Sequence, residues 1–125
     1  MSESQTHTYL KSHTLSGDAL LFDLNEQAAS VLKDTRGQGS HAARTLIKDG
    51  RMRVTIVAFQ DGGALRQHKA PGPVTIQVLQ GEIEIGVGSS AEQLTAGHCL
   101  VLGANVEHSV VAHKQSVILL TIAMT

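Results

Sequence analysis

From Thr45 onward, apolar and polar residues recur with the spacing of β-strands. The pattern begins with two strand-like segments, residues 45–48 and 51–59, which are separated by Asp49-Gly50. Asp-Gly between two apolar segments is a strong signal for a β-hairpin. Further turn signals divide the rest of the chain: Asp61-Gly62-Gly63, Pro71-Gly72-Pro73, Gln80-Gly81, residues 86–90, Ala96-Gly97, Gly103-Ala104-Asn105 and residues 112–115. These signals predict about eight short strands, arranged as a β-sandwich or a small β-barrel.

Two of the predicted strands differ in the character of their faces. Residues 82–85 alternate glutamate with isoleucine, as expected of a strand with one solvated and one buried face. Residues 117–124 are apolar on both faces, interrupted only by Thr121. We expect this last strand to be central in its sheet or to be covered by a second subunit.

One helix is predicted before the strands. Asp23 and Glu26 have the spacing of an N-cap residue and its partner in a capping box. Gly37 and Gly39 end the helical pattern. Before these glycines, apolar residues recur on one helical face: Leu24, Ala28, Val31 and Leu32. We expect this helix to cover an open end or an edge of a sheet, and we see no chemistry on it.

The order of these elements predicts how the chain is divided. Residues 1–20 have the character of a loosely held arm. We therefore expect residues 1–43 to form an N-terminal arm and a short helix that packs on the barrel, and residues 44–125 to form the β-barrel domain.

Composition and charge narrow the range of partners. With 125 residues the chain is one domain, which buries roughly two thirds of the surface that its unfolded form exposes. The formal net charge is −1, so no strong field attracts nucleic acid or an anionic membrane. The aromatic residues are Tyr9, Phe22 and Phe59, too few to form stacking platforms for single-stranded nucleic acid. We expect no nucleic-acid partner.

The N-terminal residues and the single cysteine bear on the cellular compartment. Residues 1–7 are polar and acidic, unlike a secretory signal peptide, and residues 117–124 are too short to span a membrane. These features predict a cytoplasmic protein without a membrane partner. Cys99 has no partner for an intrachain disulfide, and we expect it to be a small core residue.

Two groups of glycines and histidines carry a resemblance to a known family: Gly63, His68 and Gly81, then Gly97, Gly103 and His108. In this arrangement the chain resembles the cupin superfamily over about residues 44–124. The resemblance implies an all-β fold, the double-stranded β-helix or RmlC-like jelly roll. The glycines suit tight turns because they tolerate positive φ, and Asn105 is the next most tolerant residue type. The segment from His68 to Gly81 is similar to that of uncharacterised bacterial single-domain cupins.

The resemblance also implies a metal site, but this chain lacks half of its ligands. Cupins hold one divalent ion with three histidines and a carboxylate, and of these positions His68 and His108 remain. Ala70 and Val74 occupy the other two positions of the first motif, and neither side chain can donate a lone pair. Two imidazoles rarely suffice, since catalytic sites usually have three protein ligands. The prolines of residues 71–73 lack backbone donors, so this segment is expected to leave the sheet and to let Lys69 or Gln77 turn toward the mouth.

Three functions follow from these residues. The first, which we favour, is a small-molecule binding protein that uses His68, Ala70, Val74 and His108 around a degenerate metal site. The second is a metal-dependent enzyme, a dioxygenase or isomerase, in which His68 and His108 hold the ion together with a third, unidentified ligand. The third is a structural or interaction protein without pocket chemistry, which forms a homodimer through the apolar terminal strand. The cofactor prediction is accordingly open between none and one divalent transition-metal ion. In each case we expect a homodimer.

Overall fold

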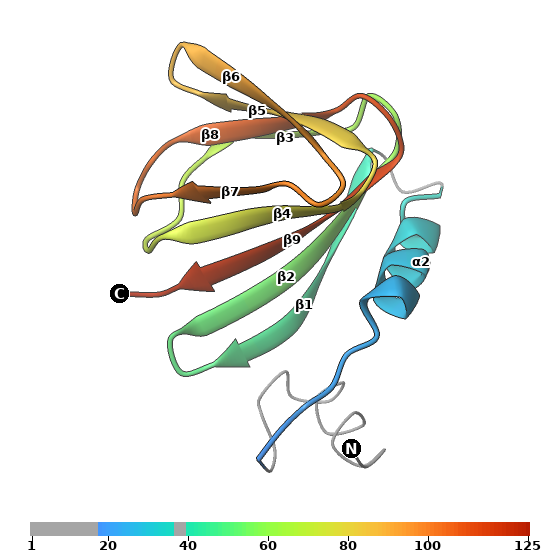
Figure 1. Cartoon of the computed structure of the whole chain (residues 1–125), viewed down its shortest axis with the longest axis vertical. Coiled ribbons are helices and arrows are strands. Elements are labelled where there is room, and N and C mark those ends of the chain that lie inside the picture. The colour runs from blue at the N-terminus through green and yellow to red at the C-terminus, as the bar shows by residue number, and fades with distance from the viewer. Residues whose placement is uncertain (1–17, 37–39) are drawn as a thin grey trace.

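The structure, a computed structural model, describes residues 18–36 and 40–125 (Figure 1). The described part contains one helix and nine strands: α2 (Leu24–Asp34), β1 (His41–Asp49), β2 (Met52–Phe59), β3 (Ala64–His68), β4 (Val74–Gln80), β5 (Glu82–Val87), β6 (Ser90–Thr95), β7 (Cys99–Leu102), β8 (His108–Ala112) and β9 (Ser116–Ala123). The first 17 residues of the predicted arm, and Gly37 and Gly39, lie outside the described residues. The first strand begins at His41, slightly before the expected start of the barrel domain.

The strands form two antiparallel sheets that face each other (Figure 1). The five-stranded sheet has the order β1-β2-β9-β4-β7, and the four-stranded sheet has the order β3-β8-β5-β6. The main core lies between the sheets and consists of buried side chains from both: Val57, Phe59, Val74, Ile76, Val78, Ile83, Ile85, Leu94, Leu102, Val110, Ala112 and Ile118. The predicted all-β jelly roll with one short helix is confirmed.

Strand β9 is central in the larger sheet, where it pairs with β2 on one side and β4 on the other. Ile118 points into the main core, and its neighbour Val117 packs on the opposite face of the sheet. Both residues are fully buried. The central position therefore explains why residues 117–124 are apolar on both faces.

Helix α2 covers the outer face of the larger sheet beside β1 and β2 (Figure 1). As predicted, Asp23 is the N-cap residue, and its carboxylate accepts hydrogen bonds from the backbone N–H groups of Asn25 and Glu26. Buried Ala28 and Val31 pack in a second core cluster with side chains of the sheet. No helix in the described part of the chain has the length and apolar character that crossing a membrane requires.

One expectation about the core is wrong. Cys99 is exposed, because it lies on β7, an edge strand of the five-stranded sheet. Leu102 of the same strand points into the core, and Cys99 and Val101 face outward, where no other described element covers the sheet at this edge.

Candidate functional site

A cavity of about 470 Å³ opens between the two sheets, and it contains every side chain that the sequence singled out for a site. Its lining includes Lys48 and Arg53 of the β1–β2 hairpin and Met124 after β9, so the cavity lies toward the end of the barrel at which this hairpin and the C-terminus lie (Figure 1). The wall consists of Thr45, Lys48, Arg53, Thr55, His68, Lys69, Ala70, Pro71, Val74, His108, Leu120, Ile122 and Met124. The site is therefore a half-open pocket with an apolar wall and several polar groups.

His68 and His108 face each other across neighbouring strands β3 and β8. Their ring centroids are 4.2 Å apart, and the rings are tilted by 59°. The Nδ1–H of His68 donates to the carbonyl of Arg66 at 2.8 Å, and that of His108 donates to the carbonyl of Val106 at 3.0 Å. Because a carbonyl can only accept, each Nδ1 carries the proton that it donates. Nε2 is then the ring nitrogen of each histidine that is left for a ligand, and both residues line the cavity.

A β-bulge in β3 brings His68 to this position. Leu65 pairs with Val110 and His68 pairs with His108, so β3 advances three residues while β8 advances two. In a regular strand Leu65 and His68 would face opposite sides. The extra residue turns both toward the inside, where Leu65 packs on the main core and His68 lines the cavity. His108 is only 3% exposed, whereas His68 remains accessible from the mouth.

The segment 69–73 leaves the sheet, as its two prolines predict, and it is held in place by its carbonyl groups. The carbonyl of Ala70 accepts from the backbone N–H of Asn105 at 2.8 Å, and that of Pro73 accepts from Ala123 at 3.1 Å. The carbonyl of Pro71 accepts from the hydroxyl of Thr125 at 2.9 Å. The segment is thus bonded to the β7–β8 loop and to the C-terminal end of β9, and it forms the rim of the cavity.

Gly72 lets this rim approach the last strand. A Cβ atom at this position would collide with the carbonyl oxygen of Ala123, and it would lie 2.7 Å from the carbonyl carbon. Of the two side chains that the sequence allowed to turn toward the mouth, Lys69 lines the cavity, and Gln77 remains exposed on β4.

Ala70 and Val74 line the same cavity as the two histidines. Neither supplies a donor atom, and the described residues contain no group of three His, Cys, Asp or Glu side chains that could hold a metal ion. Glu107, next to His108 in sequence, accepts a hydrogen bond from Gln67 at 2.7 Å and is not part of the wall. The donor set therefore does not fit the four-ligand ion of the family.

Four polar residues of the wall were not recognised from the sequence, and they belong to the β1–β2 hairpin: Thr45, Lys48, Arg53 and Thr55. Thr45 pairs with Thr55 and Ile47 pairs with Val54, so β1 carries one extra residue, Leu46. This bulge reverses the alternation of β1, and Thr45 and Lys48 consequently both line the cavity. Two adjacent apolar residues, Leu46 and Ile47, were the only sequence signal of the bulge.

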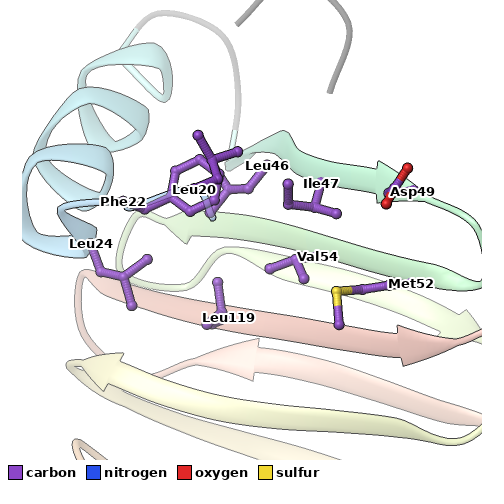
Figure 2. Close-up of a pocket in the computed structure, with 9 residues that line it drawn as sticks. All are labelled: Leu20, Phe22, Leu24, Leu46, Ile47, Asp49, Met52, Val54 and Leu119. Atoms are coloured by element: carbon purple, nitrogen blue, oxygen red, sulfur yellow. The ribbon is translucent and has the colours of Figure 1, made fainter. Parts of the chain in front are cut away.

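A second hollow, of about 390 Å³, lies on the outer face of the same sheet (Figure 2). Its walls are almost entirely apolar side chains from the segment before α2 and from β1, β2 and β9: Leu20, Phe22, Leu24, Leu46, Ile47, Met52, Val54 and Leu119, with Asp49 at one end. We call it the outer groove. Because it lacks converging polar groups, it is a weaker candidate for recognising a small polar molecule than the barrel cavity.

No protein-family model and no curated protein matches this sequence. Similar solved structures include a cupin superfamily protein from Desulfitobacterium hafniense, with 18% identity and a TM-score of 0.67 over 70% of this chain and 80% of the other. A conserved Streptococcus pyogenes protein of unknown function has 21% identity and a TM-score of 0.68 over 88% of this chain and 91% of the other.

A third similar structure is a cupin 2 conserved barrel domain protein from Leptotrichia buccalis. It has 31% identity and a TM-score of 0.64 over 69% of this chain, but the match spans only 42% of that longer chain. Taken together, these similarities define the architecture, and they do not define an activity.

Proposed function

Because the chain has the fold of the cupin superfamily, we propose that it binds a small molecule in the barrel cavity without needing a metal ion. The observation that carries this proposal is the pair His68 and His108, which line a cavity of about 470 Å³ while their Nδ1 atoms are bonded to backbone carbonyls. The nearby wall is apolar at Ala70, Val74 and Ile122. A cavity that combines apolar side chains with converging polar groups is typical of a ligand site, and a neutral imidazole Nε2 accepts from hydroxyl or N–H groups of a ligand.

A cavity-filling variant tests this proposal. Ala70 lies on the rim outside the sheet, and only its backbone carbonyl is used in holding the rim. Ala70→Phe should therefore leave the fold intact while its ring occupies the cavity. We expect binding of any hit from a library of small hydroxylated compounds, measured by ligand-observed NMR, to weaken about tenfold or more, since burial of the ligand is lost.

Ala104→Phe is the matched control, because Ala104 is exposed in a neighbouring loop and does not line the cavity. It should bind the same compounds as the unmodified chain. Compounds that still bind to Ala70→Phe and that shift the NMR signals of Met52 and Leu119 would place the ligand in the outer groove, contrary to the proposal.

The alternative function is a metal-dependent enzyme that uses His68, His108 and a third ligand. It is supported by the Nδ1 hydrogen bonds, since ligating histidines commonly donate their other N–H to a carbonyl. Elemental analysis of untagged protein purified without chelators separates the two functions. We expect far less than one transition-metal ion per chain, and a full equivalent that is lost in His68→Ala would favour the enzyme.

A further inference from the structure

The cavity wall carries an excess of positively charged side chains, to which the proposed function assigns no role. Lys48, Arg53 and Lys69 line the cavity, and no Asp or Glu side chain does. These three residues form no ion pair with the described residues. The chain as a whole has a net charge of −1, so the cavity is locally cationic on a molecule that is close to neutral.

Two of these cations are direct neighbours. Lys48 on β1 and Arg53 on β2 are cross-strand partners, and both side chains line the cavity. Like charges directly opposite each other in an antiparallel pair destabilise a sheet. The bulge at Leu46 creates this pair, because in a regular strand Lys48 would point away from Thr45 and from the cavity. The hairpin thus brings two cations together at the cavity wall, where Lys48 remains exposed, at some cost in stability.

Arg53 is held in a defined position. Its Nη1 donates to the carbonyl of Gly50 at 2.8 Å and to that of Met52 at 3.0 Å. The other guanidinium nitrogens make no hydrogen bond with the described residues, and they keep their N–H donors for a ligand. Thr45 and Thr55, which pair with each other on the same hairpin, add hydroxyl groups to this part of the wall.

We propose that the natural ligand is a small organic anion, with its carboxylate or phosphate bound by Lys48 and Arg53 and its hydroxyl groups directed to His68 and His108. This inference rests on the proposed function, because it assigns the ligand class of the same cavity. An anionic head between the two cations converts a repulsive pair into charge-assisted hydrogen bonds. The apolar side chains of Leu120 and Ile122 contact the body of the ligand. Lys69 on the rim faces the entering anion.

A matched pair of probes tests the charge requirement. We use 4-hydroxyphenylacetate and its neutral amide, 4-hydroxyphenylacetamide, with inorganic phosphate as a third probe that distinguishes a phosphate head from a carboxylate. Binding is followed by two-dimensional NMR at probe concentrations up to tens of millimolar. The acid should bind about tenfold more tightly than the amide, with shifts that include Lys48, Arg53, His68 and His108.

Variants of the hairpin locate the effect. Lys48→Gln should weaken binding of the acid about tenfold and leave binding of the amide unchanged. Arg51→Gln is the control, since Arg51 is an exposed cation of the same hairpin that does not line the cavity. Without any probe, Lys48→Gln should also raise the Tm by about 2 °C, because the like-charge pair is removed.

The outcomes separate this inference from the proposed function. Equal affinities for the acid and the amide, with NMR shifts at the two histidines, would contradict the inference that the ligand is an anion. The cavity would still be a ligand site. Equal effects of Lys48→Gln and Arg51→Gln would also contradict that inference. Shifts at Lys48 and Arg53 without any at the histidines would support the anion and contradict the proposed role of the histidines. If neither the acid nor phosphate gives a saturable shift, the anion site does not exist.

Discussion

Gly81 connects β4 to β5, and two properties of its backbone exclude a side chain. Its φ is +93°, in the region that favours glycine. A Cβ atom here would also collide with the hydroxyl of Ser116 and would lie 2.5 Å from the carbonyl oxygen of Gln115. Ser116 is fully buried, and its hydroxyl accepts from the backbone N–H of Glu82 at 3.0 Å and donates to the carbonyl of Lys114 at 2.8 Å, so moving it would break both hydrogen bonds.

We expect Gly81→Ala to lower the free energy of unfolding by about 3 kcal/mol, from backbone strain and steric overlap together. Gly97→Ala is the control, because Gly97 has the same φ of +93° but open space around the new Cβ. It should lose only about 1 kcal/mol, from backbone strain alone. Urea unfolding of both variants measures the difference. Equal losses would show that the contact with Ser116 contributes nothing.

At the scale of single residues, the sequence identified candidates where the chemistry was visible in residue types. Asn105, the non-glycine residue judged most tolerant, does adopt a positive φ of 63°. The structure brings His68 and His108 together as the spacing of the motifs suggested. Lys48 and Arg53 could not be found in the same way, because a surface lysine and a wall lysine look alike when the alternation of their strand is unknown. Cys99 was misplaced because the edge position of its strand depends on the order of strands in the sheet.

Among the elements, the helix depends on local interactions that are visible in the sequence. Asp23 accepts hydrogen bonds from Asn25 and Glu26 at 3.0 and 3.2 Å. At the other end, Arg44 of β1 donates to Ser30 at 2.9 Å and forms an ion pair with Asp34. The helix is therefore fixed at its first turn by a cap and along its length by one arginine of the sheet.

Asp23→Ala should destabilise the first turn of α2 by about 1 kcal/mol, because two backbone N–H groups lose their acceptor. Hydrogen exchange should become faster in α2 and remain unchanged in the barrel strands. Asp18→Ala, an exposed carboxylate outside the helix, is the control and should change neither. Faster exchange throughout the barrel would contradict the local role of the cap.

The strands and the first hairpin were predicted from alternation and turn residues, and the bulges were not. A bulge shifts the alternation of inward and outward side chains by one residue, and it hardly changes the amino-acid composition of the strand. In β3 the bulge falls between Leu65 and His68, where no glycine marks it. The face of the sheet to which the side chains after a bulge point depends on the register with the neighbouring strand. That register cannot be read from the sequence of the bulged strand alone.

For the molecule as a whole, the five-stranded sheet is a wall shared by two hollows. Its inner face borders the barrel cavity, and its outer face borders the outer groove, which α2 leaves uncovered (Figure 2). Met52 at one end of the groove is 52% exposed. The homodimer that the sequence led us to expect stays a prediction, and the outer groove is the apolar surface through which we expect the two copies to meet.

We expect sedimentation equilibrium to give twice the chain mass of 13.2 kDa at micromolar concentration. Met52→Glu should raise the dissociation constant about tenfold or more, because a charge is then buried in an apolar contact. Val101→Glu is the control, since Val101 is an apolar residue with 65% exposure on β7, at the opposite edge of the sheet from β1. A monomer at all concentrations, or equal effects of both variants, would contradict this interface.

The contacts between residues 124–125 and the cavity rim affect how this protein should be prepared. Met124 lines the cavity, and Thr125 is bonded to the rim through Pro71. A polyhistidine tag fused after Thr125 would therefore begin at the rim of the cavity that His68 and His108 line. Its own histidines could complete their coordination, and metal measured in such a fusion would describe the tag.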